Sequence, residues 1–339
     1  MSSISQSAER VSSSGGVGRA SLAAGDNFAR SGLAVAAGAA WLLLAFITLR
    51  WPDLGDWGRG PELAIGASVL GAALLLGGLF GPVWESGAAR LRRLTPWLLA
   101  LGLFFSVWQA TTAKLGVLPQ PFFPPPHAIL EVFIDDWAKL AESVVASIKL
   151  ELLGFLLGAG AGFVTGVLLG WSRAFGYWAH PVLRLIGPLP AIAWLPIAFY
   201  AFPSSWSASI FLIGLTTGFP VTVLTWSGVA SVNAAYYDVA RTLGASRLFL
   251  VFKVAIPAAL PHVFVGLFMG LYYSFAVLVV AEILGAKYGL GWYIQFETNY
   301  SGYANVYATL IIMSLICAGL VKLLFIVRDR LLSWQEGFI

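Results

Sequence analysis

Few residues in this chain have the type and spacing that chemistry requires. The 339 residues include one cysteine and three histidines, so neither a disulfide framework nor a Cys/His metal site is expected. His127 has no second metal-ligand candidate at a suitable spacing, and we assign it a structural role at a surface. Glu282 is the one carboxylate near the end of an apolar run, where an acid either serves function or stabilises a turn. The glycines that follow it favour a turn at least as much as a substrate site.

The sequence also lacks the short motifs of common catalytic and nucleotide-binding sites. It has no GxxxxGK[ST] phosphate loop, no HExxH, no CxxC and no GxSxG. The GAGAG stretch at 158–162 lies inside an apolar run, so it is not a dinucleotide-binding loop. The few acids within apolar runs do not form the charge relay of a proton-driven carrier. We therefore predict that the chain is not an enzyme and that it binds no cofactor and no metal.

Long apolar helices must position these few polar residues. Hydrophobic residues make up 59% of the chain and charged residues 11%, whereas soluble domains have about 25% charged residues. A transmembrane helix needs about 20 mostly apolar residues. We predict an all-α polytopic membrane protein with about eight such helices, at 32–50, 62–83, 95–113, 145–170, 180–202, 207–229, 261–284 and 304–327.

The distribution of basic residues predicts the orientation. Eight spans place both termini on one side of the membrane, and the segments on that side hold fourteen of the twenty Lys and Arg residues. The segments on the other side hold six: Arg50, Arg59, Lys114, Lys139, Lys149 and Lys287. Because cytoplasmic loops carry the excess of basic residues, we predict that both termini are cytoplasmic. The basic isoelectric point thus reflects topology, and nucleic-acid binding is not expected.

Four segments follow from these patterns. Residues 1–31 are rich in Ser, Gly and Ala, and they cannot bury enough apolar surface to offset the entropy of ordering, so we predict a disordered tail. Residues 32–93 form an additional transmembrane pair without polar groups for a site, which we interpret as an anchor or packing layer. Residues 94–330 form the main transmembrane domain, and 331–339 a second tail. Within the main domain, the apolar spacing from His127 onward predicts a short interfacial helix.

Two spans have unusual backbone patterns. The fourth span has glycine at every fourth position, at 154, 158, 162, 166 and 170, which places the glycines on one face and favours close helix packing. Lys149 and Glu151 flank its outer end, where we expect them to reach the membrane interface. The fifth span holds four prolines, and irregular backbone at membrane depth is tolerated where it is buried in protein or lines a water-filled cavity.

The fifth span is therefore our first candidate for a substrate pathway. A kinked helix without substrate contact is an equally supported alternative. The sixth and seventh spans contribute hydroxyl groups and an acid that could line the same pathway. The candidate pathway residues are Pro190, Trp194, Tyr200, Thr216, Thr217, Ser274 and Glu282.

Residues 231–260 form a mixed polar and apolar segment between the sixth and seventh spans. Asn233 is a plausible N-cap of a first short helix, and Gly244 can end that helix in the left-handed conformation. Ser246 can cap a second helix, and Pro257 is expected where the next segment begins. With the predicted orientation, this segment faces the cytoplasm and has the shape of a docking surface for another protein.

The 231–260 segment resembles the EAA signature in permease subunits of ABC-type importers. That signature reads E-A-A, three residues, G, nine residues, I-x-L-P, and in this chain Asp238, Val239 and Ala240 stand for E-A-A. Gly244 and the Val254 to Pro257 stretch keep the remaining spacing. The stretches PLPAIAWLPIAFYAF and AEILGAKYGLGWYI resemble the subfamily that imports nitrate, sulfonates, taurine and bicarbonate. Leu150 departs from it, since a basic residue is expected there.

The resemblance covers about residues 95–330 and implies a six-helix-like type I ABC permease core after two additional N-terminal spans. It implies an ATP-driven importer of the bacterial inner membrane for a small solute, most naturally an anion such as nitrate, a sulfonate, taurine or bicarbonate. Two permease chains, expected to be a homodimer, would surround the pathway, cytoplasmic ABC ATPase subunits would bind ATP and Mg, and an extracytoplasmic protein would deliver the substrate. The residues that it assigns to ATPase coupling are Asp238, Ala240, Arg241, Gly244, Arg247, Ile256 and Pro257.

Other functions remain open. A permease of the same class could import a thiamine-pyrimidine precursor or another small organic solute. An ion-gradient-driven carrier or channel belongs to a different class, and transport without an ATPase would favour it. A membrane-embedded enzyme or scaffold would need a polar constellation that the sequence does not contain.

Overall fold

Helices make up all of the regular structure in the part of the chain that the computed structural model describes, residues 32–79, 85–187 and 189–334. Side chains are described in these ranges except at 85–93. Absence of strands from the described residues confirms the all-α prediction. The predicted tail at 1–31 and most of the predicted tail at 331–339 lie outside the described residues.

Seven described helices are long and apolar enough to cross a membrane, or eight if one bent pair is counted as a span. This confirms the prediction of about eight spans. The seven are Gly32–Arg50, Gly60–Leu79, Leu94–Lys114, Trp137–Trp171, Ser205–Ala230, Arg247–Gly285 and Tyr303–Leu331.

The fifth predicted span, 180–202, is not one helix. The structure has α6 at Arg173–Ile186, then a short turn of 3₁₀-helix at Ala191–Trp194 that continues into α7 at Leu195–Ala201, and the two parts are sharply bent against each other. Pro190 accounts for the break, because its backbone is extended and it disfavours helix in the residue before it, whereas Pro196 lies in the first turn of α7, where proline is tolerated.

The chain divides into two compact units, Met1–Asp135 and Asp136–Ile339. In the first unit, the helix Gly32–Arg50 packs with α2, Gly60–Leu79, and α3, Glu85–Gln109. The Trp41 indole donates a hydrogen bond to the Leu98 carbonyl at 2.9 Å. The third predicted span, 95–113, therefore packs on the additional N-terminal pair, which gives the described part of the first unit three long helices.

The predicted interfacial helix is present as α4, Pro126–Asp135, in the same unit. The surface position expected for His127 is wrong, because its side chain is fully buried. Its ring lies 5.5 Å from that of Trp57, centre to centre, and its Nδ1 lies 3.0 Å from the Gln109 side chain. The polar partner is 18 residues away, so local spacing could not reveal it.

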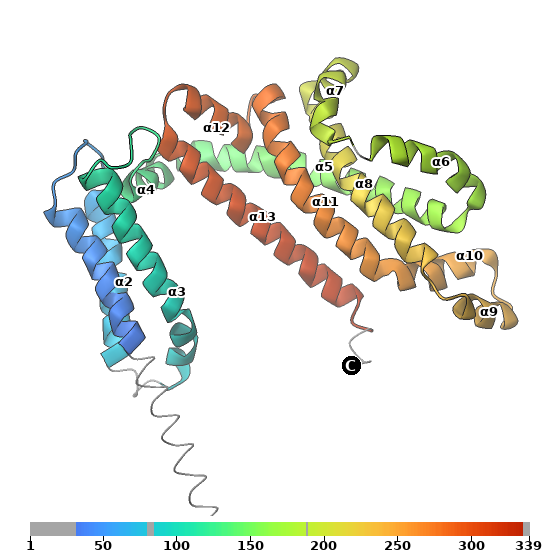
Figure 1. Cartoon of the computed structure of the whole chain (residues 1–339), viewed down its shortest axis with the longest axis horizontal. Coiled ribbons are helices and arrows are strands. Elements are labelled where there is room, and N and C mark those ends of the chain that lie inside the picture. The colour runs from blue at the N-terminus through green and yellow to red at the C-terminus, as the bar shows by residue number, and fades with distance from the viewer. Residues whose placement is uncertain (1–31, 80–84, 188, 335–339) are drawn as a thin grey trace, which may run out of the picture. The chain divides into compact units, whose positions relative to one another are not determined.

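The second unit is built on three long helices, α5, α8 and α11 (Figure 1). Its helices are α5 Trp137–Trp171, α6 Arg173–Ile186, α7 Leu195–Ala201, α8 Ser205–Ala230, α9 Ala234–Thr242, α10 Arg247–Phe249, α11 Ile256–Gly285, α12 Leu290–Asn299 and α13 Tyr303–Leu331. A π-helical segment, Leu250–Ala255, joins α10 to α11. A core of Leu150, Leu212, Ile213 and Leu278 lies where the three long helices meet.

The glycine ridge of α5 is the surface that receives α8. A Cβ atom built on Gly162 would lie 2.5 Å from the Gly218 carbonyl oxygen, and one on Gly158 would overlap the backbone of Gly214. On the other side of α8, Cβ atoms at Gly266 and Gly270 of α11 would be within about 3 Å of its backbone or side chains. The predicted close packing of the ridge is confirmed, because only glycine allows this approach of helix backbones.

The expected start of the next helix at Pro257 is confirmed, although the backbone stays helical on both sides of it. One continuous helical path of 39 residues, Arg247–Gly285, joins the end of the 231–260 segment to the seventh span. Pro257 stands at the start of α11, where its missing donor removes little, and the preceding π-helical turn accommodates the ring. The short helix that Ser246 starts therefore continues through the π-helical segment into α11.

Candidate functional site

The first short helix of the 231–260 segment is bounded as its sequence predicts. Asn233 Oδ1 accepts a hydrogen bond from the Ala235 N–H at 3.0 Å. Gly244 has φ +82°, and the N–H groups of Gly244 and Ala245 donate to the carbonyls of Arg241 and Ala240. This pair of backbone hydrogen bonds is the pattern that ends helices at a left-handed glycine. Ser246 Oγ then accepts from the Phe249 N–H at 3.3 Å and starts α10.

The outer surface of this segment is apolar to a degree unusual for an exposed turn. Leu243 is 83% exposed and Leu248 70%. Further exposed apolar side chains lie beside them: Tyr236, Val239, Phe249 and Phe252. Exposed apolar side chains gathered in one short segment indicate an interaction surface. We call these six residues the 231–260 patch.

The side chains expected to couple to a partner lie around this patch. Asp238, Arg241 and Arg247 are exposed, and Asp238 pairs with Arg241 at 3.4 Å. Ala240, Ile256 and Pro257 are half-buried at its base. The segment is anchored by Tyr237, whose ring packs edge-on against Trp171 of α5 at 5.9 Å between ring centres. The surface is thus held in a defined position by the helix core.

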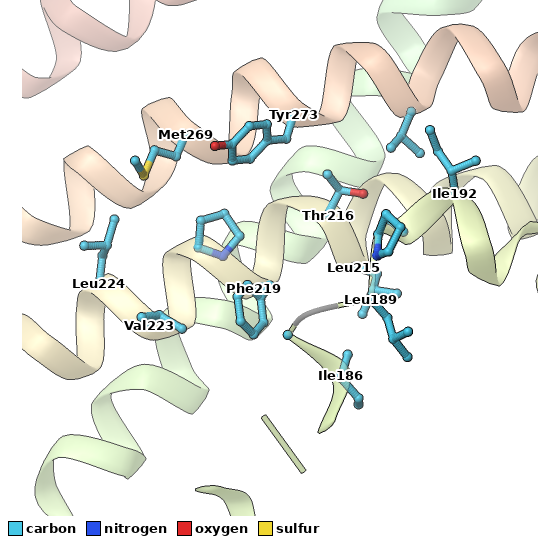
Figure 2. Close-up of a pocket in the computed structure, with 15 residues that line it drawn as sticks. Ile186, Leu189, Ile192, Leu215, Thr216, Phe219, Val223, Leu224, Met269 and Tyr273 are labelled. Atoms are coloured by element: carbon cyan, nitrogen blue, oxygen red, sulfur yellow. The ribbon is translucent and has the colours of Figure 1, made fainter. Parts of the chain in front are cut away.

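A cavity of about 570 Å³ lies between α6, the Ala191–Trp194 turn, α8 and α11 (Figure 2). Two predicted pathway residues line it, Pro190 and Thr216, and Tyr273 and Met269 of α11 face them. The Thr216 hydroxyl donates to the Leu212 carbonyl at 2.8 Å, so its hydrogen is already used within α8. The lining is otherwise mostly apolar.

The other predicted pathway residues are not brought together with these two. Tyr200 is 94% exposed on α7, and Trp194 packs half-buried in the core next to Leu195. Thr217 is fully buried against Gly270 of α11. Their role in a substrate pathway stays a prediction.

Glu282 is buried and stabilises the turn between α11 and α12. Its Oε1 accepts from the Ser147 hydroxyl at 2.6 Å and its Oε2 from the Gly291 N–H at 2.7 Å. Ser147 Oγ in turn accepts from the Leu290 N–H at 2.8 Å. Gly289, with φ +129°, passes so close to the carboxylate that a Cβ atom would overlap it. The turn that the glycines predict is present, and one carboxylate ties it to α5.

Glu151 does not reach the membrane interface as expected. It is 1% exposed, and its Oε1 accepts a short hydrogen bond from the Ser274 hydroxyl of α11. The reason lies in helix periodicity, since Ser147, Glu151 and Gly154 continue the glycine face of α5. That extension of the ridge was the signal in the sequence that could have placed Glu151 inside. Ser274 is accordingly a partner of Glu151 in the core.

A second buried polar cluster, in the first unit, was missed by the sequence reasoning. The Lys114 ammonium is fully buried, lies 2.8 Å from Asp53 Oδ1, and donates to the Thr48 carbonyl at 3.2 Å. Burial lowers the pKa of the neighbouring His127, with the Lys114 charge acting in the same direction and Asp53 opposing it. The cluster closes one end of the three-helix unit, and its members are too distant in sequence to form a recognisable motif.

A family model described as "Binding-protein-dependent transport system inner membrane component" matches residues 158–336, more than half of the chain. The match includes the α5 ridge from Gly158 onward, the 231–260 segment and the Glu282 turn. It begins beyond the first compact unit.

Three curated proteins are similar over a longer range. The nitrate import permease protein NrtB of Synechococcus elongatus is 30% identical over 254 residues, which cover 72% of this chain and 89% of NrtB. SsuC of Bacillus subtilis, named for aliphatic sulfonates transport, is 30% identical over 243 residues, 71% of this chain and 88% of SsuC. The bicarbonate transport system permease protein CmpB of Synechococcus elongatus is 32% identical over 196 residues, 58% and 68% of the two chains.

Proposed function

Since the chain belongs to the family of binding-protein-dependent transport system inner membrane components, we propose that it forms the membrane pathway of an ATP-driven importer for a small oxyanion. Nitrate, an alkanesulfonate such as taurine, and bicarbonate are the substrates proposed. The names of three similar permeases support this range, because each denotes a small oxygen-bearing anion.

The 231–260 patch is the observation that carries the proposal. Its six exposed apolar side chains lie on a segment that is capped at Asn233 and Ser246 and is continuous with α11. A rigid helical extension can transmit a displacement of its tip along the whole span. The chain has no phosphate loop of its own. We infer that the patch docks on separate cytoplasmic ATPase subunits, which bind ATP and Mg and drive the cycle.

The remaining partners follow from the same family. A second copy of the chain would complete the pathway, and an extracytoplasmic binding protein would deliver the solute. The family description, an inner membrane component, supports a location in a bacterial inner membrane. The bias of basic residues supports cytoplasmic termini. The substrate pathway is proposed to include Pro190 and Thr216 at the cavity between α6, α8 and α11.

A capture experiment tests the docking surface. The Leu248→Asp variant places a charge in the patch at a position that is 70% exposed, so the fold should be unaffected. We expect purified variant to retain its ATPase subunit about tenfold less well than wild type, as for a residue in the core of an interface. Gly244→Trp should act in the same direction, because the left-handed backbone at this position is strained with any side chain.

Leu54→Asp is the matched control, since Leu54 is an equally exposed leucine of the first unit and far from the 231–260 segment in sequence. It should retain the ATPase as wild type does. Equal retention by Leu248→Asp and Leu54→Asp would exclude the patch as the docking surface. Ion-gradient-driven transport by the purified chain alone would refute the ATP-driven importer itself.

A further inference from the structure

A second cavity, of about 670 Å³, lies at the end of the second unit opposite the 231–260 segment. The first turns of α5 and α8 form two of its walls, and the end of α11 with the turn to α12 forms the third. It is the most polar of the described cavities that the core helices form. Its charged lining residues are Glu142, Lys149, Glu282 and Lys287.

The two lysines of this cavity are unengaged cations. Lys149 and Lys287 are exposed, and neither takes part in an ion pair within the described part of the chain. They come from different elements, α5 and the turn after α11, and meet at one cavity. The lining also includes Trp206, with its large apolar surface, and Ser205.

The two acids of the cavity are not equivalent. Glu282 is fully buried, and both of its oxygens already accept hydrogen bonds from Ser147 and Gly291. Glu142 is exposed and lies two helical turns before Lys149, on the same face of α5. Glu142 and Lys149 are separated by about 10 Å along the axis of α5, which leaves room for a small solute between their long side chains. Glu142 is therefore the acid available to a ligand.

The balance of charge determines which ligand suits the cavity. Because Glu282 is buried and already hydrogen-bonded, the charged groups open to a ligand are Lys149, Lys287 and Glu142, and Glu142 repels a bare anion. A solute with one acidic and one amino group matches both signs at once. Complementarity of this kind selects a ligand by charge arrangement rather than by net charge.

We propose that this cavity is a solute-entry site, that Lys149 and Lys287 hold the acidic group of the solute, and that Glu142 holds its amino group. This rests on the proposed function, because only a transport subunit admits solute, and it narrows the substrate to a small zwitterion such as an aminoalkanesulfonate. The buried Glu282 holds the Lys287 turn in place and does not contact the solute.

Ligand binding to the full chain in lipid nanodiscs tests the site. Saturation-transfer NMR would compare taurine with ethanesulfonate, which lacks only the amino group. We expect wild type to bind taurine about tenfold more tightly, the effect of one charge-assisted contact. Glu142→Gln should remove this preference by weakening taurine alone. The double variant Lys149→Gln with Lys287→Gln should weaken both probes by about tenfold or more.

Lys139→Gln is the matched control, because Lys139 is an exposed lysine of α5 outside the cavity lining. It should bind both probes as wild type does. Equal affinity of wild type for the two probes, absence of saturable binding, or a double variant that behaves like Lys139→Gln would each overturn the inference. These outcomes leave ATPase capture by the 231–260 patch untouched, so failure of the site and failure of the proposed function are distinguishable.

Discussion

Glu151 is an acidic residue in an almost fully buried position. The side chain is buried between α5 and α11, and no basic side chain pairs with it among the described residues. Ser274 has one hydroxyl hydrogen but two neighbours, the Leu271 carbonyl at 2.9 Å and Glu151 Oε1. The Ser274 hydroxyl is therefore shared between these two acceptors, and Glu151 has no cation beside it among the described residues. Burial of an unpaired charge costs several kcal/mol, so this position should tolerate an added cation poorly.

The buried position of Glu151 leads to a prediction on stability. Glu151→Gln keeps the size and the hydrogen bond, so we expect the free energy of unfolding to stay within about 1 kcal/mol of wild type. Glu151→Lys places a charge at the same position and should cost about 3 kcal/mol. Thermal unfolding of the full chain in detergent, followed by tryptophan fluorescence, measures both.

Glu142→Lys serves as the control for the Glu151 variants, because it changes the charge equally at an exposed position of the same helix. It should change the free energy of unfolding by no more than about 0.5 kcal/mol. A Glu151→Gln variant as unstable as Glu151→Lys would contradict the expectation that a neutral side chain of this size satisfies the site.

At the scale of elements, the second unit depends on the contact of α5 with α8. The ridge glycines of α5 lie against backbone atoms of α8, whereas a Cβ atom added at Gly160, two positions from Gly158, would meet no neighbouring atom within 4 Å. Two glycines of one GAGAG stretch thus have opposite environments. Only one of them is required by packing.

This difference predicts opposite effects of the same substitution. Gly158→Ala forces the helices apart and should lower the free energy of unfolding by about 1 to 3 kcal/mol. Gly160→Ala adds the methyl group in open space and should leave stability unchanged or raise it by about 0.5 to 1 kcal/mol, through the lower flexibility of alanine in the unfolded chain. Thermal unfolding of the two variants side by side is the measurement. Equal destabilisation would contradict a ridge that packs on one face.

At the scale of the whole molecule, the helical path Arg247–Gly285 runs from one end of the second unit to the other. Thirty-nine helical residues extend about 58 Å, which exceeds the thickness of a bilayer core of about 30 Å. The topology predicted from the basic residues would therefore place the 231–260 patch and the charged cavity on opposite sides of the membrane. The docking and entry roles proposed for them require this separation.

Cysteine labelling tests the orientation directly. In a Cys317→Ser background, we expect Lys287→Cys to react with a membrane-impermeant maleimide in intact cells, because the excess of basic residues places that end outside. Leu248→Cys should react only in inside-out vesicles. Both positions are exposed, so lack of reaction reports the side of the membrane rather than burial. The reverse pattern would contradict cytoplasmic termini.

Local patterns carried enough information for the helices, their caps and the family. The apolar runs required membrane spans because lipid satisfies no backbone hydrogen bond, and Asn233, Gly244 and Ser246 act on groups within a few residues of themselves. The spacing from Asp238 to Pro257 identified the segment that the family match includes. These features could be predicted because each depends on neighbours along the chain.

Only the tertiary structure decided which side chains meet across long separations. Ser147 contacts Glu282 from 135 residues away, Ser274 contacts Glu151 from 123, and the Thr48 carbonyl accepts from Lys114 across 66. His127 and Glu151 were expected at surfaces, because a single sequence shows which residues share a helix face but not which helix covers that face. Burial of a polar group is decided by its distant partner, and the energy of that pairing enters only when the helices pack.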